Sequence, residues 1–271
     1  MGLRHFTPNP SLHRYVQSFS ILEEHQAVFN KRIILPDSSP QLLINFGAPF
    51  IWDVTNRSQV ELPRAFLVWA STGPLRIRAT GPCYFIGVNF YAWGLRFLVD
   101  ERINLAAGPI IPLDHDWPDL FRLLEKTLRQ RDDIEAFATL EHFISDLYNH
   151  TTIDITTVRE AIELLYSTGG QFWVNELAER CYISVSQLER RLKYFTGLSP
   201  KSLARLIRFD TACSGLVDNS SNRLTDLAHN LGYIDQAHFN HDFKMFTGRT
   251  PREVRNYVRC LAEDAEFLQL S

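Results

Sequence analysis

A segment of 17 residues occurs twice in this chain, 51 residues apart, and it limits what the C-terminal part can fold into. Residues 184–200 read SVSQLERRLKYFTGLSP, and residues 235–251 read DQAHFNHDFKMFTGRTP. In both copies the apolar residues recur at the i, i+4, i+7 spacing of a buried helix face. Each copy opens on a helix-capping residue and closes with Gly and then Pro. The identical pairs are Lys193/Lys244, Phe195/Phe246, Thr196/Thr247, Gly197/Gly248 and Pro200/Pro251.

The two copies differ mainly at positions that the same spacing places on the exposed face. In a helix–turn–helix, a first helix supports a second one, whose exposed N-terminal half fits the DNA major groove. Side chains that hydrogen-bond base edges dominate both exposed faces. These positions are Val185, Ser186, Gln187, Glu189, Arg190 and Arg191 in the first copy, and Gln236, Ala237, His238, Asn240, His241 and Asp242 in the second. The alternative is an all-helical interaction domain with a polar surface.

The pattern of apolar residues divides the chain near residue 151 into two domains. Before that point, runs typical of β-strands occur at 42–46, 64–72, 75–80 and 83–90, and helical spacing begins near residue 116. After residue 156 every segment is helical in pattern, including a connecting helix over 201–217 that would span about 26 Å. We therefore expect an N-terminal regulatory domain over 1–150, a DNA-binding domain over 157–259 and a tail over 260–271.

Charge is distributed unevenly along the chain, which carries a net charge of −3. Residues 171–259 hold 13 Lys and Arg against 9 Asp and Glu, a balance of +4, and the remainder holds 15 against 22, a balance of −7. This asymmetry favours an anionic partner for the C-terminal domain. No apolar run reaches membrane-spanning length, and the four cysteines show no Cys-x-x-Cys spacing. We expect a cytoplasmic protein without a metal or cofactor.

The C-terminal hundred residues resemble the DNA-binding domain of the AraC/XylS family of bacterial transcription regulators. The resemblance rests on both copies, on Arg208 and Ala212 of the connecting segment, and on GYIDQAHFNHDFKMFTGRTPREVR at 232–255. It implies two helix–turn–helix modules that place recognition helices in adjacent major-groove segments of promoter DNA, with activation as the commoner mode and contact with RNA polymerase. The family's base-contacting sites fall on Ser186, Glu189, Arg190, Gln236, Ala237, His238, Asn240 and His241.

Other positions of the C-terminal domain have simpler interpretations or depart from the family. Lys193 and Lys244 are expected to meet backbone phosphates or solvent rather than bases. His241 stands where the family often has Arg, so contact with a base, a phosphate or solvent all remain open. Glu189 either accepts a hydrogen bond from cytosine or tempers the neighbouring arginines. Gly215 stands where an apolar residue is usual, and it is expected to loosen the connecting helix by about 1 kcal/mol.

The N-terminal half resembles, more loosely, the sensor-like domain of some AraC-type regulators. LPDSSPQLLINFG, IGVNFYAWGLRFL and IIPLDHDWPDL carry the likeness, although Tyr91-Ala92-Trp93-Gly94 replaces the usual Pro-Gly. The resemblance implies a small β-barrel-like domain followed by helices that can pair two subunits in a homodimer. Such a domain either binds a small-molecule effector or only mediates dimerisation. The aromatic residues that either line a pocket or form an ordinary core are Phe46, Phe50, Trp52, Trp69, Phe85, Phe90 and Trp93.

An enzyme is the third class of function considered. Some AraC-type proteins resemble DNA-repair methyltransferases with metal-bound cysteines, but Cys83 is the only cysteine in the first half of this chain. The histidines of that half lack the close pairing of a metal site. Cys83 is either a buried strand residue, which its apolar setting favours, or a redox sensor, whereas packing roles are expected for Cys181 and Cys213. The combined prediction is an α+β, two-domain DNA-binding regulator that is not an enzyme.

Overall fold

The N-terminal half of the chain forms two β-sheets, and the second of them also includes a two-residue strand from residues 267–268. The computed structural model describes residues 2–24, 31–55, 58–69, 73–99, 105, 108–113, 118–129, 133–149, 153–217, 224–260 and 267–268. The first sheet has the strand order β1 (Gly2–Phe6), β2 (Val16–Glu24), β9 (Cys83–Phe90), β4 (Gln41–Asn45), β7 (Ala65–Val68) and β10 (Ile110–Pro112). The second has the order β11 (Phe267–Leu268), β3 (Lys31–Ile34), β8 (Leu75–Ala79), β5 (Phe50–Thr55) and β6 (Ser58–Glu61). Among the described residues neither sheet closes on itself, so the expected barrel-like domain is seen as two open sheets.

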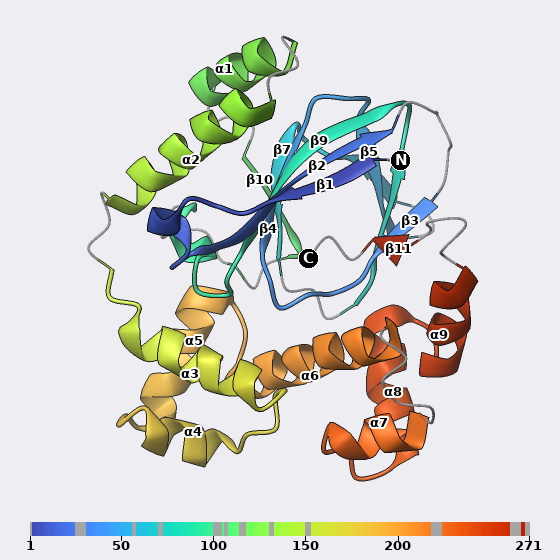
Figure 1. Cartoon of the computed structure of the whole chain (residues 1–271). Coiled ribbons are helices and arrows are strands. Elements are labelled where there is room, and N and C mark those ends of the chain that lie inside the picture. The colour runs from blue at the N-terminus through green and yellow to red at the C-terminus, as the bar shows by residue number, and fades with distance from the viewer. Residues whose placement is uncertain are drawn as a thin grey trace.

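The first sheet is covered on both faces, which explains the nearly continuous apolar composition of its central strands. Phe85 packs with the second sheet, whereas its neighbour Ile86 faces the opposite core and is fully buried. That opposite face is covered by α1 (Pro118–Arg129) and α2 (Asp133–Asn149), which lie beside the sheet in Figure 1. Strands buried on both faces lose the apolar–polar alternation that normally marks a strand. The aromatic residues of the predicted set that are buried in this core are Phe50, Trp69, Phe85, Phe90 and Trp93.

The C-terminal region consists of helices, which form a layer below the sheets in Figure 1. They are α3 (Thr156–Ser167), α4 (Val174–Arg180), α5 (Val185–Thr196), α6 (Pro200–Val217), α7 (Leu224–Asn230), α8 (Gln236–Thr247) and α9 (Pro251–Cys260). Two short 3₁₀ helices, η1 (Pro10–Leu12) and η2 (Leu95–Phe97), belong to the N-terminal half. We call α4 with α5 the first helix pair and α7 with α8 the second helix pair. Helix α6 joins the two pairs.

The repeated sequence produces the same local bonding in both helix pairs. Thr196 Oγ1 donates to the carbonyl of Leu192 at 2.6 Å, and Thr247 Oγ1 donates to the carbonyl of Phe243 at 2.8 Å. Each hydroxyl also accepts the backbone N–H two residues further along the chain. The glycines that follow adopt left-handed φ values of +66° and +74°, which glycine tolerates best. The shared Thr-Gly dipeptide therefore ends both helices in the same way.

The turns inside the two helix pairs are also equivalent, except for one inserted residue. The N–H of Ile183 donates to the carbonyl of Ala178, and the N–H of Tyr233 donates to that of Ala228. One residue then separates Ile183 from α5, whereas two separate Tyr233 from α8, and the extra residue is Ile234. The duplicated unit therefore extends from the first helix of each pair and contains a longer turn in its second copy.

Two glycines let the helices of this region approach closely. A methyl group on Gly170 would lie 2.1 Å from the carbonyl oxygen of Ala204 in α6, and the φ of Gly170 is +75°. A methyl group on Gly215 would lie 2.8 Å from Leu227 Cδ1 in α7. Helix α6 continues through Gly215 to Val217. The expectation that Gly215 only loosens this helix is incomplete, because this glycine also gives Leu227 its place against α6.

Candidate DNA-binding surface

The first helix pair presents one face of α5, mainly in its N-terminal half, to solvent and buries the opposite face. The Ser184 hydroxyl caps α5 by accepting the backbone N–H of Gln187 at 3.2 Å, and the side-chain oxygen Oε1 of Gln187 accepts the backbone N–H of Ser184 at 2.9 Å. This reciprocal capping box fixes the start of the helix. The predicted contact residues on its exposed side are Ser186, Gln187, Glu189, Arg190 and Lys193. The buried stripe of α5 consists of Leu188, Leu192 and Phe195, as the spacing predicted.

Arg191 lies at the edge of this surface rather than at its centre. Its side chain is half-buried, unlike that of Arg190, which is exposed. The pKa of Asp154 lies below its ordinary value, chiefly because Asp154 accepts hydrogen bonds from Thr156, and the positive charge of Arg191 adds to this effect. Arg191 therefore acts on the segment before α3 as well as on the solvent side of α5.

The second helix pair presents α8 in a similar way, with Asp235 accepting the N–H of His238 at 2.7 Å as the N-cap. The exposed predicted residues are Gln236, Ala237, His238, His241 and Lys244, while Asn240 is half-buried. Its core stripe, Phe239, Phe243 and Phe246, is buried as expected. The only fixed cation among these predicted α8 residues is Lys244. The exposed face of α8 thus has less positive charge than that of α5.

Asp242 was expected on the outward face of α8, and that prediction is wrong. Its side chain is 3% exposed and accepts a hydrogen bond from Nη2 of Arg205 in α6 at 2.8 Å. A buried carboxylate needs such a partner because loss of hydration is costly. Neither residue of this pair was recognised from the sequence, because Arg205 lies 37 residues away on another helix. The pair fastens α8 to α6.

Helix α6 sets the separation between the two exposed faces. Its 18 residues span about 27 Å at 1.5 Å per residue. Arg208 of α6 donates to the carbonyl of Gly170 at 2.9 Å and lies over the Tyr233 ring, 5.3 Å from its centroid. Gln171 donates to the carbonyl of Asn230 at 2.8 Å, which links the two halves of the region directly. These bonds hold the helix pairs in a fixed relation.

The N-terminal half contacts the C-terminal end of α5 and contributes to the buried cluster of the second helix pair. Phe97 of η2 meets Phe195 with ring centroids 6.5 Å apart, and Arg96 lies 4.5 Å above the Tyr194 ring. Leu35 belongs to the buried cluster of the second helix pair. The N-terminal halves of α5 and α8 keep their exposed side chains among the described residues.

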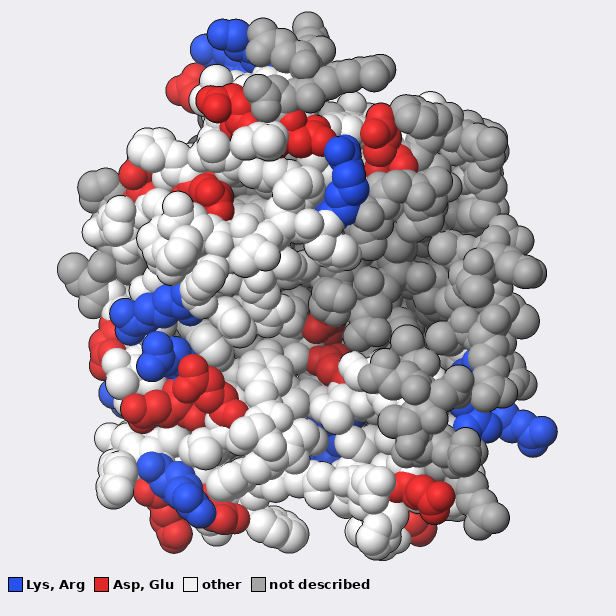
Figure 2. All heavy atoms as spheres, in the orientation of Figure 1, with Lys and Arg blue, Asp and Glu red and all other residues white. Residues whose placement is uncertain are grey.

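Charges of both signs are mixed over the described surface. On the face seen in Figure 2, blue and red side chains alternate across the helical layer, and no continuous basic band crosses its described part. Attraction to phosphate would then depend on a few local cations rather than on a broad positive field. Among the described residues no group of three potential metal ligands occurs, and no helix has the length and apolar composition needed to cross a membrane.

Comparisons with known proteins identify the helical region. Residues 177–257 match the family described as a Helix-turn-helix domain, and residues 4–110 match a Domain of unknown function (DUF6597). The HTH-type transcriptional activator RhaS of Escherichia fergusonii is 34% identical over 165 residues, which are 59% of this chain and 53% of RhaS. RhaS of Pectobacterium carotovorum subsp. carotovorum is 30% identical over 185 residues, 60% of this chain and 65% of the relative. The helical region therefore contains a helix-turn-helix domain of the AraC type.

This match agrees with the resemblance found in the sequence of the helical region, and these relatives are named as transcriptional activators, not as enzymes. The chain spans about half the length of RhaS from E. fergusonii. ToxT from Vibrio cholerae O395 has a similar fold, with a TM-score of 0.52 at 13% identity over 89% of this chain and 98% of ToxT. A further ToxT structure, with a TM-score of 0.50 at 11% identity over 88% and 94%, is described as unsaturated fatty acid bound. At such identities the likeness concerns the fold alone.

Proposed function

We propose that this chain is a sequence-specific transcription regulator of the AraC family, which binds double-stranded promoter DNA and activates the genes it controls. The proposed division is a regulatory domain over 1–150, a DNA-binding domain over 157–259 and a tail over 260–271. The first and second helix pairs would act as two helix–turn–helix modules. The similarity to RhaS activators supports activation, which implies contact with RNA polymerase.

One observation carries this proposal: the two helix pairs are built alike and both leave the polar N-terminal half of the second helix exposed. Most residues that differ between α5 and α8 lie on these exposed halves, whereas the shared Phe, Thr and Gly form the core and the C-terminal caps. A protein-interaction domain would not need two equivalent polar helix ends held at one separation. The span of α6, about 27 Å, suits helices that enter successive turns of the major groove, roughly 34 Å apart.

The proposed division of labour on DNA follows from side-chain chemistry. We assign base contacts to residues that hydrogen-bond base edges and phosphate contacts to the two lysines near the helix ends. The side-chain oxygen of Gln187 takes part in the capping box. Its side-chain nitrogen is outside those bonds and can donate to DNA. The base-reading set is Ser186, Glu189, Arg190, Gln236, Ala237, His238, Asn240 and His241, and the supporting set is Gln187, Arg191, Lys193 and Lys244.

The N-terminal half is proposed to control this binding, either as the receptor of a small effector or as the surface of a homodimer. Its contacts with α5 support control, because Phe97 and Arg96 pack on the recognition helix itself. A change in the N-terminal half could thus alter the position of α5 relative to α8. No cofactor is required for this mode of action.

Arg190 provides the test of sequence-specific recognition. Arg190→Ala should cost about 1–3 kcal/mol of binding free energy on the selected DNA site and relax preference at one base pair. Affinity for random DNA should change less. The measurement is fluorescence anisotropy with both DNAs, and Arg122→Ala, an exposed arginine on α1 far along the chain, is the control. Equal losses on both DNAs would make Arg190 a phosphate contact, and no loss on either would contradict the proposed surface.

A further inference from the structure

A pocket of about 520 Å³ lies where the N-terminal half of the chain meets the first helix of the C-terminal region, and we call it the junction pocket. Its N-terminal side comes from residues 13–17, at the start of β2, and from the turn after β9. Its other side comes from α3. Sites for small molecules have volumes of this order and combine apolar walls with a few placed polar groups. The lining residues are His13, Arg14, Gln17, Tyr91, Trp93, Arg159, Glu163 and Tyr166.

Hydrogen bonds fix the N-terminal side of the junction pocket. Trp93 Nε1 donates to the carbonyl of Arg14 at 2.8 Å, and the N–H of Tyr91 donates to the carbonyl of Tyr15 at 2.9 Å. The Tyr91 and Trp93 rings stack in parallel, with centroids 4.7 Å apart. Trp93 is buried, whereas Tyr91 is half-buried and is the accessible member of the stack. The pocket thus has a preformed aromatic wall on which a flat ring can pack.

Helix α3 supplies the opposite wall through side chains spaced four and three residues apart. Arg159, Glu163 and Tyr166 therefore share one face of the helix. Arg159 Nε lies 3.4 Å from the Glu163 carboxylate. The Tyr166 hydroxyl donates to Ser38 Oγ at 3.2 Å, which ties this face of α3 to the N-terminal half. Helix α3 also contacts α4 and α5, so a ligand in the junction pocket would touch a helix that supports the first helix pair.

The junction pocket has an excess of positive charge. Its lining holds Arg14 and Arg159 against Glu163, two cations against one anion, a balance of +1. Glu163 is paired with Arg159, whereas Arg14 forms no ion pair with any residue that the structure describes. Asp154 lies outside the lining, and its carboxylate interacts electrostatically with both Arg191 and Arg14. When these two residues are included, three arginines face two carboxylates, and the balance is again +1.

The uncharged polar groups of the lining add a donor. Gln17 Oε1 accepts a hydrogen bond from Ser39 Oγ at 3.3 Å, so the Gln17 side chain keeps its Nε2 donor for a ligand. His13 Nε2 donates to the carbonyl of Pro8 at 2.8 Å, which holds this ring at the edge of the pocket. An anion with two acceptor oxygens matches the resulting set of donors.

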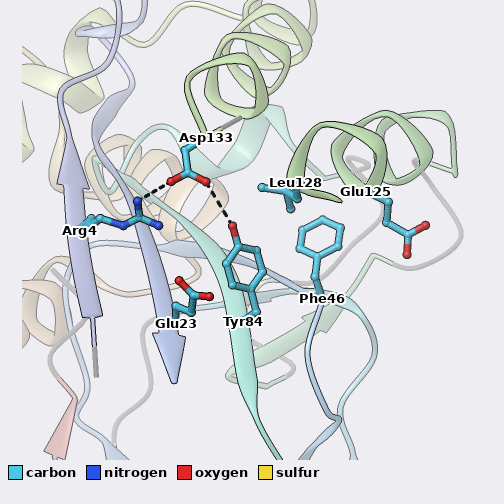
Figure 3. Close-up of a pocket in the computed structure, with 7 residues that line it drawn as sticks. All are labelled: Arg4, Glu23, Phe46, Tyr84, Glu125, Leu128 and Asp133. Carbon is cyan, nitrogen blue, oxygen red and sulfur yellow. Dashed lines mark hydrogen bonds and ion pairs between the residues drawn. The ribbon is translucent and has the colours of Figure 1, made fainter. Parts of the chain in front are cut away.

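Another pocket, of about 510 Å³, lies between the first sheet and helices α1 and α2, and Figure 3 shows its lining. Two of its carboxylates are already paired, Asp133 with Arg4 and Glu125 with Arg64. The Tyr84 hydroxyl also donates to Asp133, at 3.4 Å. These pairs supply no excess charge for a charged ligand. The junction pocket is therefore the stronger candidate for a ligand site.

We propose that the junction pocket binds a small aromatic carboxylate, whose charge meets Arg14 and Arg159 and whose ring packs on Tyr91. Guanidinium groups bind carboxylates through paired, charge-assisted hydrogen bonds. A ligand held from both sides bridges the N-terminal half and α3. The proposal gives the regulatory domain of the proposed function a ligand class, and it rests on that function only for an effect on DNA binding.

The first test uses the full chain and three probes: benzoate, its neutral counterpart benzamide, and cyclohexanecarboxylate, which has the charge without the flat ring. Benzoate at about ten times its Kd should raise the midpoint of thermal unfolding by about 2–5 °C. The other two probes at the same concentration should give smaller shifts. An equal shift with benzamide would overturn the requirement for charge, and an equal shift with cyclohexanecarboxylate would overturn the requirement for an aromatic ring. No shift with benzoate would overturn the proposal outright.

Variants locate the binding, which is necessary because the exposed arginines of α5 also attract anions. Arg14→Gln, on the N-terminal side, and Arg159→Gln, on α3, should each weaken benzoate binding about fivefold to tenfold in isothermal titration. Glu163→Gln should tighten it, since this change removes the opposing carboxylate and releases Arg159. Arg122→Gln changes an exposed arginine of α1 outside the pocket and should leave benzoate binding unchanged.

Equal effects of Arg14→Gln and Arg122→Gln would overturn the site, and so would weaker binding by Glu163→Gln. A loss with only one of Arg14→Gln and Arg159→Gln would overturn the bridge between the two sides. Because these titrations contain no DNA, absence of benzoate binding in a chain that binds DNA removes only this proposal. Benzoate binding by a chain that binds no DNA would support the junction pocket and contradict the proposed function.

Discussion

The two glycines that end α5 and α8 provide a matched test of how the N-terminal half meets the first recognition helix. Both adopt a left-handed backbone, with φ of +66° at Gly197 and +74° at Gly248. Substitution by alanine should cost about 1 kcal/mol at either position for this reason alone. The surroundings differ. A methyl group on Gly197 would lie 2.9 Å from the carbonyl carbon of Leu105, whereas one on Gly248 would approach only Arg76 Nη2, at 3.9 Å.

This difference sets the expected magnitudes. The neighbour of Gly197 is backbone, which cannot rotate away, and overpacking of this kind costs about 1–3 kcal/mol. Gly197→Ala should therefore lower the free energy of unfolding by about 2–4 kcal/mol, against about 1 kcal/mol for Gly248→Ala. The loss for Gly197→Ala has an upper limit, because the N-terminal half can instead separate from the end of α5. The cost is then that of losing the Phe97–Phe195 and Arg96–Tyr194 contacts.

The assay is urea unfolding of the full chain followed by circular dichroism, with both variants and the parent measured under one condition. Gly248→Ala serves as the control because it has the same backbone penalty without the close neighbour. Equal losses for the two variants would refute the reasoning, since they would show that Leu105 does not lie against the end of α5 in solution.

Three further outcomes are expected. Arg205→Met removes the ion pair of Arg205 with the buried carboxylate of Asp242 and leaves only the longer contact with His241, at 3.8 Å. It should cost about 3 kcal/mol in urea unfolding, and a loss under about 1 kcal/mol would show that the Arg205 pair contributes little to stability. Burial, and then the neighbouring Asp37, raise the pKa of Asp210 well above its ordinary value, so ionisation of Asp210 destabilises the fold as the pH rises. Asp210→Asn should therefore raise the unfolding midpoint at about pH 7 and lose that gain near pH 4, and equal shifts at both would contradict the assignment. Lys244→Ala should weaken binding to all DNA sequences alike and lower the salt dependence by about one, whereas an unchanged slope would exclude a phosphate contact.

Local signals predicted the helical region well. The spacing of Leu188, Leu192 and Phe195, the caps and the closing Gly-Pro all describe contacts within one helix, so they are visible in the sequence. The repeat was visible in the sequence for the same reason, because its identical residues form the same local structure in both copies. The threonine of the repeat was noted only as an identity, although it satisfies a carbonyl and an N–H at the end of each helix.

The contacts that the sequence did not reveal join residues far apart in the chain. Asp242 was placed on the wrong face because its partner Arg205 lies on α6, and a charged residue in an amphipathic pattern is otherwise expected outside. The first two strands were not predicted, because β2 mixes apolar residues with Ser18 and the buried Ser20. Gly87 of β9 accommodates Ser20, since a methyl group there would lie 2.6 Å from its hydroxyl oxygen.

The pocket between the first sheet and helices α1 and α2 was also not predicted from the sequence. Phe46 was among the aromatic residues considered, but the polar side of this pocket comes from strands β1, β2 and β9 and from the start of α2. Their meeting depends on the register of Glu23 against Tyr84. Register is a tertiary property that follows from which faces become buried.

Selection of bound sequences from a random pool of duplex DNA tests the central claim most directly. With α5 and α8 held apart by α6, the full chain should select two short motifs separated by about one helical turn. Arg190→Ala should weaken the base preference within one motif, and His241→Ala should weaken it within the other. Selection of a single motif whose base preference only Arg190→Ala weakens, or a pool without enrichment, would contradict recognition by two helices.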